Sequence, residues 1–258
     1  MFKEKFQNQE VVIGTWIQIP SASICEIAAA QKLDWLAVDM EHTEIGYETL
    51  IDMFRGLKGT DTAPFVRVRE NSALDIRRAL DIGAEGVIVP LVHTAEEASK
   101  AVSYSKYPKK GCRGHAFCRA NEWGLGFHEY AKSANDRTCV FVMIESRQAV
   151  ENIDKILLTD GLDGIFIGPY DMSASYGVTG DVSNKLVTDG CNRVLEACKK
   201  HNKIAGIHIV NPDQKTIQEN IEKGFQFIAV GIDTLFLMNG IENAVSMVKK
   251  ASVNKNSI

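Results

Sequence analysis

Ionisable side chains that could act together follow several short apolar runs of this sequence. Asp39 lies near the end of the second run and His42 follows it, Arg67 lies in the third, Glu145 ends the fifth and Asp171 follows the sixth. Each side chain alone could simply cap a helix or form a buried ion pair. Five ionisable groups converging on one cavity would require pairing or a ligand, because removing charges from water is costly. We therefore expect a functional site where these runs end.

The chemistry of such a site follows from its residue types. Glu145 and Asp171 have no Cys or His beside them, so they form a hard, oxygen-only pair. Such a pair suits Mg²⁺ or Mn²⁺ completed by water and substrate oxygens, and is poorly suited to a closed zinc site. An imidazole near a carboxylate, such as His42 near Asp39, can serve as a general base near neutral pH.

A lysine is missing from the ends of these runs. Lys32 and Lys203 precede the runs that they adjoin. An aldolase that forms an imine needs a lysine among its reacting groups. If the substrate is a 2-oxo acid, we expect a metal to polarise its carbonyl group.

The elements that position these residues form a repeating pattern. Short apolar runs rich in β-branched residues each precede a longer amphipathic segment, as in βα units. Several runs are almost continuously apolar, which is typical of parallel strands buried on both faces. The predicted strands are Val11–Ile19, Asp34–Met40, Pro64–Val68, Gly86–Val92, Cys139–Glu145, Leu162–Pro169, Ile204–Val210 and Gln226–Asp233.

Signals for helix ends lie between the runs. Thr94 with Glu97 three residues later predicts a capping box, and Ser72 predicts a helix start. Gly83, Gly161 and Gly224 are placed to end helices.

Eight βα units predict a single-domain (β/α)₈ barrel, an α/β fold known as the TIM barrel, over residues 1–251. Residues at the strand ends would then face one shared mouth. An open doubly wound sheet is the alternative, although Gly14-Thr15-Trp16-Ile17 stands where a dinucleotide-binding motif would be expected. We expect residues 104–138 to form a long loop over the mouth, and residues 252–258 a polar tail.

Composition excludes some partners. The 258 residues carry a net charge of −4 with no local basic cluster, which argues against nucleic acid. No apolar run approaches the roughly 20 residues that a membrane span needs, and the charged start lacks a signal peptide. Six cysteines without a C-x-x-C pair indicate reduced thiols. We therefore expect a cytoplasmic protein.

A set of short motifs, in order, resembles the HpcH/HpaI family of metal-dependent 2-oxo-acid aldolases. The likeness extends from Gly14 to Asp233, and its motifs are Asp39-x-Glu41-His42, Val66-Arg67, Tyr107-Pro108-x-x-Gly111-x-Arg113-Gly114, Ile144-Glu145-Ser146 and Gly168-Pro169-x-Asp171-x-Ser173. The family includes 4-hydroxy-2-oxoheptanedioate aldolase and 2-dehydro-3-deoxyglucarate aldolase.

The resemblance implies a reaction and a role for each residue. Residues matching Glu145 and Asp171 bind a divalent cation (Mg²⁺, Mn²⁺ or Co²⁺) that chelates pyruvate, and the residue matching Arg67 stabilises the pyruvate enolate. His42, paired with Asp39, would handle the proton of the aldol hydroxyl. The expected reaction is reversible class II aldol cleavage of a 4-hydroxy-2-oxo acid to pyruvate and an aldehyde.

Further contacts and the assembly follow from the same resemblance. We expect the substrate to contact Trp16, Arg113, Gly168, Pro169 and Tyr170. Family members form homohexamers, as trimers of dimers, by packing their last helices. The segment Leu235–Val248 is apolar on more than one face, as such a helix would be.

Departures from the family pattern keep other functions open. Met143 stands where the family commonly has Gln two residues before the metal-binding Glu. One alternative is a Claisen-type lyase or synthase acting on a citrate-like or CoA-thioester substrate, and another is a non-catalytic binding barrel. The distal part of the substrate could be bound by His115, Arg119 and Trp123, or these residues could pack against a neighbouring subunit. We expect the His208 imidazole to lie in the core.

Overall fold

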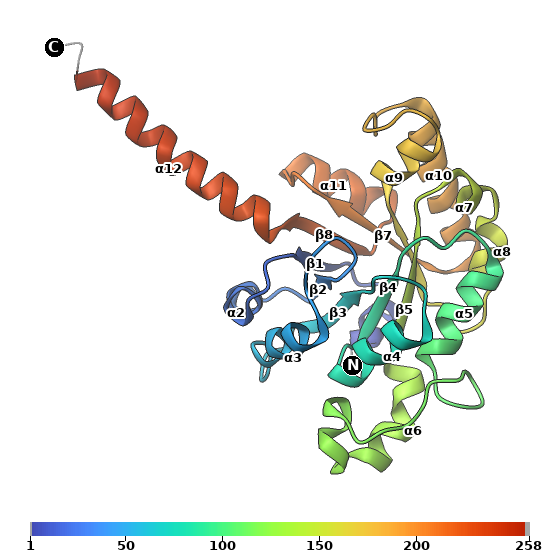
Figure 1. Cartoon of the computed structure of the whole chain (residues 1–258). Coiled ribbons are helices and arrows are strands. Elements are labelled where there is room, and N and C mark those ends of the chain that lie inside the picture. Colours follow the sequence, from blue (N-terminus) through green and yellow to red (C-terminus); the bar gives the residue numbers. More distant parts are fainter. Residues whose placement is uncertain (1, 256–258) are drawn as a thin grey trace.

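A computed structural model describes residues 2–255 and shows a closed barrel of eight parallel strands (Figure 1). Each strand pairs with the next along the chain, and the last pairs with the first. The strands are β1 (Val12–Ile17), β2 (Trp35–Asp39), β3 (Ala63–Arg67), β4 (Gly86–Val89), β5 (Cys139–Ile144), β6 (Gly164–Ile167), β7 (Ile204–Ile209) and β8 (Phe227–Ile232). The predicted (β/α)₈ barrel and all eight strand positions are confirmed.

Helices alternate with the strands and cover the outside of the barrel (Figure 1). They are α1 (Phe2–Gln7), α2 (Ala22–Ala30), α3 (Tyr47–Arg55), α4 (Ala73–Ile82), α5 (Ala95–Ser105), the 3₁₀ helix η1 (Arg119–Gly124), α6 (Phe127–Arg137), α7 (Arg147–Glu151), α8 (Ile153–Leu157), α9 (Pro169–Ser175), α10 (Lys185–His201), α11 (Gln214–Lys223) and α12 (Asp233–Lys255).

Most of the predicted helix ends are present, but Gly161 does not end a helix, because α8 ends at Leu157 and Gly161 lies in the turn before β6. The Thr94 side chain accepts a hydrogen bond from the Glu97 N–H, and the Glu97 carboxylate accepts one from the Thr94 N–H, which completes the capping box. Ser72 caps α4 by accepting from the Asp75 N–H. Gly83 and Gly224 end α4 and α11 with φ of 113° and 103°, a conformation that costs glycine little.

An aromatic core fills the interior of the barrel below the mouth. Phe227 on β8 is fully buried, and its ring centroid lies 4.1 Å from that of Trp35 and 4.4 Å from that of Phe141. Phe2 and Phe6 of α1 add their rings from the N-terminal end of the strands. Because the rings fill the space, ligands can enter only above them, at the mouth.

The segment predicted to overhang the mouth lies at the opposite end of the barrel. Helix α5 follows β4 and crosses to the N-terminal end of the strands before the segment begins. There the Lys106 Nζ donates to the Thr138 carbonyl oxygen at 2.7 Å, immediately before β5, and Arg119 donates to the carbonyl oxygens of Ile82 and Phe54, where α4 and α3 end. The prediction was wrong because it overlooked that crossing, and the segment holds η1 and α6 (Figure 1).

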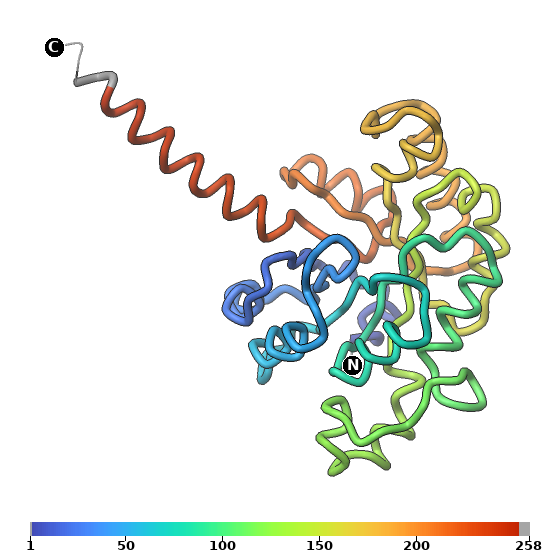
Figure 2. The backbone as a smooth tube through the Cα atoms, in the orientation of Figure 1, coloured from blue at the N-terminus to red at the C-terminus, as the bar shows by residue number. Residues whose placement is uncertain are grey.

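Helix α12 runs away from the barrel rather than along it (Figures 1 and 2). It continues through Lys255, so the segment expected to be a tail from residue 252 begins inside this helix, and residues 256–258 lie outside the described residues. Within residues 2–255, no helix combines the length and the apolar character that crossing a membrane requires.

We expect Phe227→Ala to lower the free energy of unfolding by roughly 3–5 kcal/mol, the usual cost of removing a buried aromatic ring. Chemical denaturation measures the change. Phe117→Ala is the matched control because the Phe117 side chain is 73% exposed. Equal losses in the two variants would contradict the packing described for the aromatic core.

Candidate active site

A buried ion pair occupies the centre of the mouth. The Asp39 side chain is fully buried and that of Arg67 is 13% exposed. Arg67 donates from Nε to Asp39 Oδ1 at 2.9 Å and from Nη2 to Oδ2 at 2.6 Å, a bidentate pair. Burial opposes ionisation of Asp39, but the hydrogen bonds and charge of Arg67 outweigh it and lower the pKa of this carboxyl. The pair remains charged at neutral pH.

Glu41 joins this pair, although the sequence analysis gave it no role. Its Oε2 lies 3.4 Å from Arg67 Nε. Burial raises the pKa of Glu41 to about 7. The positive charge of Arg67 lowers this pKa, whereas the negative charges of Asp39 and Asp171 raise it further. The sequence did contain a signal for Glu41, because this residue lies two positions after Asp39 in the motif that also contains His42.

His42 lies at the rim of the mouth rather than against Asp39. Its side chain is 56% exposed, and its Nε2 is 3.6 Å from Glu41 Oε2. Only the backbone N–H of His42 reaches Asp39, at 3.3 Å from Oδ1. The expected pairing of the imidazole with Asp39 is therefore wrong, because the Asp39 carboxylate is taken up by Arg67 and Gln18.

Glu145 and Asp171 come from neighbouring strand ends, as predicted. The Leu91 N–H donates to Glu145 Oε1 at 2.7 Å. Burial is the main cause that raises the pKa of Glu145 to about 7, and the charges of Glu41 and Asp171 add to it. The negative charges of Glu41 and Asp171 thus oppose ionisation of Glu145, and a bound cation would offset them.

The surroundings of Glu145 fit a divalent cation. A Cβ at Gly168 would lie 2.9 Å from Glu145 Oε2, so glycine keeps the space beside this oxygen open. Within residues 2–255 no three His, Cys, Asp or Glu side chains are grouped to hold a metal by themselves. Two carboxylates with open positions suit Mg²⁺ or Mn²⁺, which keep several sites for water and substrate.

A cavity of about 110 Å³ opens beside these carboxylates. The predicted substrate residues Trp16, Gly168, Pro169 and Tyr170 all line it, as do Arg67 and Asp171. The Arg67 guanidinium carbon lies 4.7 Å from the centre of the Trp16 ring, in a cation–π contact. The cavity therefore has a cationic wall next to an anionic one.

Arg113 is not part of this mouth. Its side chain is fully buried, donates to Asp81 at 2.8 Å and lies against the rings of Tyr107 and Tyr130. Asp81 belongs to the last turn of α4, at the N-terminal end of the barrel. Arg113 therefore makes no contact with the mouth of the same chain among the described residues, and its contact with substrate stays a prediction.

His208 lines the cavity, whereas the sequence analysis treated it as a core imidazole. Its Nε2 donates to the Gly231 carbonyl oxygen at 2.8 Å, and its ring makes an edge contact with Trp16. Burial lowers the pKa of His208 to about 4, and the charge of Arg67 contributes. The available signal was the position of His208 near the end of β7, where inward side chains reach the mouth.

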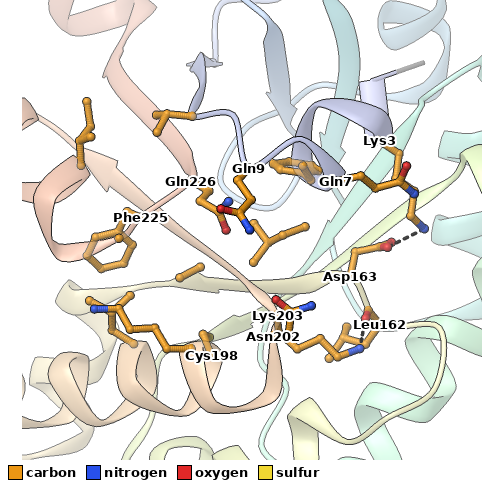
Figure 3. Close-up of a pocket in the computed structure, with 18 residues that line it drawn as sticks. Lys3, Gln7, Gln9, Leu162, Asp163, Cys198, Asn202, Lys203, Phe225 and Gln226 are labelled. Carbon is orange, nitrogen blue, oxygen red and sulfur yellow. Dashed lines mark hydrogen bonds and ion pairs between the residues drawn. The ribbon is translucent and has the colours of Figure 1, made fainter.

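A separate cavity of about 630 Å³ lies at the N-terminal end of the barrel, between α1, α10 and α11 (Figure 3). Two interactions cross its edge in Figure 3: Lys3 pairs with Asp163, and Lys203 donates to the Leu162 carbonyl oxygen. None of the carboxylates at the mouth lines it. We therefore assign the candidate active site to the mouth.

The protein is a (β/α)₈ barrel with charged residues at its mouth. Comparison with known proteins identifies a family with the same fold. Residues 12–240 match the model of the HpcH/HpaI aldolase/citrate lyase family. The 2-keto-3-deoxy-L-rhamnonate aldolase of Escherichia coli (strain K12) is 35% identical over 96% of this chain and 92% of its own.

Solved structures give the same result. An HpcH/HpaI aldolase/citrate lyase family protein from Burkholderia cenocepacia J2315 superposes with a TM-score of 0.91 at 30% identity, covering 96% of this chain and 98% of its own. The citrate synthase SbnG superposes with a TM-score of 0.87 at 28% identity, covering 97% and 98%. The chain belongs to the HpcH/HpaI aldolase/citrate lyase family. It is a carbon–carbon lyase of the aldolase type.

We expect Asp39→Asn to lower the free energy of unfolding by about 3 kcal/mol, near the lower end for breaking a buried ion pair, because Glu41 still compensates part of the Arg67 charge. Denaturation of the purified variant measures the loss. Asp52→Asn breaks the exposed Asp52–Arg55 pair and should cost no more than about 1 kcal/mol. A similar small loss at Asp39 would show that the central pair does not stabilise the fold.

Proposed function

We propose that this chain cleaves 2-keto-3-deoxy sugar acids reversibly to pyruvate and an aldehyde, and that Glu145 and Asp171 hold the divalent cation it requires. The observation that carries this proposal is the position of Glu145 and Asp171 after neighbouring strands, with Asp171 and Arg67 lining one cavity and Gly168 leaving space beside Glu145 Oε2. The relatives named 2-keto-3-deoxy-L-rhamnonate aldolase support the substrate class.

The cation, when bound, supplies Lewis-acid polarisation of the substrate carbonyl. Arg67 then faces the oxygen on which negative charge develops when the C3–C4 bond breaks. Because Asp39 holds the guanidinium in a fixed position, little reorganisation is needed as the charge appears. Backbone N–H groups after Gly168 hold the carboxylate of the 2-oxo acid where α9 begins.

His42 accepts the proton of the 4-hydroxyl group in cleavage. Its exposed position at the rim suits contact with the aldehyde half of the substrate, which lies furthest from the buried pair. Glu41 positions the imidazole, since it is the carboxylate nearest to His42 Nε2. Glu41 thus takes the part that the sequence analysis gave to Asp39.

A citrate-forming or citrate-cleaving reaction is the second candidate. The structural similarity to the citrate synthase SbnG favours it, since the same groups would stabilise an enolate in Claisen-type chemistry. The 35% identity to sugar-acid aldolases favours the aldol reaction instead. Loss of oxaloacetate that depends on acetyl-CoA, without cleavage of 2-keto-3-deoxy acids, would reverse this preference.

We expect EDTA to abolish pyruvate release from 2-keto-3-deoxy-L-rhamnonate and Mg²⁺, Mn²⁺ or Co²⁺ to restore it. Glu145→Gln should lower kcat/KM by about 10²–10³-fold, as when a group that supports developing charge is removed. Glu129→Gln, at a side chain 82% exposed, is the control and should have no effect. Cleavage that persists in EDTA and is trapped by borohydride would indicate an imine mechanism and contradict the proposal.

We further propose that α12 joins two copies of the chain, which then assemble as a trimer of dimers. The helix extends away from the barrel (Figure 1) and exposes Phe236, Leu237, Met238, Ile241, Val245, Met247 and Val248, each between 46% and 66%. An exposed apolar surface of this size is typical of a protein interface. A second copy offers the same surface, so the two helices can cover each other.

We expect light scattering to give six copies for the wild-type chain and fewer for Ile241→Glu, because the new carboxylate would be buried without a partner. Asn243→Glu places the same charge at a polar position of the same helix and serves as control. A monomeric wild-type protein would contradict the proposed assembly.

A cytoplasmic location agrees with the cysteines. All six are free thiols, and Cys25, Cys118, Cys139 and Cys198 are buried. Unpaired thiols persist in reducing compartments. We propose the cytoplasm as the site of action on this basis.

A further inference from the structure

We propose that the cavity at the N-terminal end of the barrel binds a small phosphorylated sugar, free or as part of a nucleotide. This second site is separate from the mouth and does not depend on the proposed function. The cavity measures about 630 Å³, within the usual range of small-molecule sites, and residues of α1, α10 and α11 surround it (Figure 3). None of the residues placed in the reaction lines it.

The charges around this cavity are unbalanced. Lys3, Lys199 and Lys203 line it, and Asp163 is the carboxylate among its described lining residues. Asp163 Oδ1 pairs with Lys3 at 2.5 Å, and its Oδ2 accepts from the Val140 N–H at 2.8 Å. Within residues 2–255 neither Lys199 nor Lys203 forms an ion pair. An anion in the cavity would therefore meet two ammonium groups that no carboxylate neutralises.

The two unpaired lysines lie close in sequence, where α10 ends and β7 begins. A Cβ at Gly224 would lie 3.0 Å from Lys199 Cε and 3.5 Å from Lys199 Nζ, so glycine leaves the room that this side chain occupies. Burial lowers the pKa of Lys203; the charge of Asp163 raises it, and that of Lys3 lowers it further. A bound anion would oppose the lowering, because a negative charge favours the protonated amine.

Lysine rather than arginine supplies the positive charge of this cavity. An ammonium group is a compact point charge and a common phosphate ligand, whereas the planar guanidinium of arginine matches a carboxylate in bidentate geometry. Among the residues that the structure describes, no arginine lines the cavity. The charged groups therefore favour a phosphate over a carboxylate.

Amide side chains supply partners for hydroxyl groups. Four of them line the same cavity and are labelled in Figure 3: Gln7, Gln9, Asn202 and Gln226. Their side chains make no hydrogen bond within residues 2–255. An amide can both donate and accept, as recognition of sugar hydroxyl groups requires. The buried Phe225 adds an apolar wall against which a sugar ring or a base can pack.

The test measures binding of glucose 1-phosphate and of AMP to the full chain by calorimetry, with inorganic phosphate and glucose as separate probes. Glucose 1-phosphate has no free aldehyde group, so it cannot act as an aldol substrate. We expect a phosphorylated sugar to bind more tightly than inorganic phosphate or glucose, and Tm to rise with its concentration. Tighter binding of AMP would assign the apolar wall to a base, and tighter binding of glucose 1-phosphate would assign the cavity to a sugar alone.

Variants locate the site. Lys199→Gln should raise Kd by about 3–5-fold, the effect of losing an exposed ion pair, and Lys199→Arg should retain most of the affinity. Lys200→Gln is the matched control, because it removes the same charge from the next position of α10, where Lys200 pairs with Asp154. Ile221→Trp should weaken binding by filling the cavity without a change in charge. Gln218→Trp, on the same helix but outside this cavity, should not.

Three results would overturn the proposal. Equal Kd values for inorganic phosphate and both phosphorylated sugars would contradict the ligand class. Binding that neither Lys199→Gln nor Ile221→Trp weakens would place the ligand elsewhere on the protein. Absence of binding of both phosphorylated sugars to the wild-type chain would contradict the site itself.

Discussion

The bidentate pair of Arg67 with Asp39 is the interaction on which the arrangement of the mouth depends. A guanidinium that is only 13% exposed must be neutralised, and Asp39 does so from the neighbouring strand. The register of β2 and β3 places these two residues side by side, so the pairing follows directly from the alignment of neighbouring strands. Once Arg67 is fixed, Glu41 lies against its Nε and the Trp16 ring lies against its face. Among residues 2–255, no ion pair is present at the carboxylates that remain, Glu145 and Asp171.

Strand positions could be predicted from sequence because parallel strands buried on both faces leave continuous apolar runs. The same regularity placed Arg67, Glu145 and Asp171 at the mouth, since one end of every strand faces it. Which charged side chains at the mouth form ion pairs with one another could not be predicted in this way. Asp39 lies within three residues of both Glu41 and His42 in sequence, but it is bound by Arg67, which lies 28 residues away in sequence. Strand register decides such contacts, and apolar patterning alone does not reveal it.

The misplaced segment around Arg113 has a related cause. The length and composition of residues 104–138 predicted a functional loop. The end of the barrel at which these residues lie depends on whether a helix stands between β4 and the segment. Helix α5 does, so Arg113 pairs with Asp81 far from the carboxylates. Its Nε and Nη1 lack hydrogen-bond partners within residues 2–255, and the faces of Tyr107 and Tyr130 take their place. A motif shared across a family can therefore support the fold rather than the reaction.

Met143 bears on whether the mouth is still catalytic. Its thioether cannot supply the hydrogen bonds of the Gln that is common at this position, which suggested loss of activity when the sequence was considered alone. The structure places Met143 in the wall of the cavity that Arg67 and Asp171 also line, with the Met143 sulfur 4.0 Å from Arg67 Nη1. Burial and the charges of Glu41 and Asp171 raise the pKa of Glu145, and a bound cation would offset both. We therefore interpret Met143 as a change in the wall of the cavity beside Arg67, because the charged residues of the mouth are all present around it.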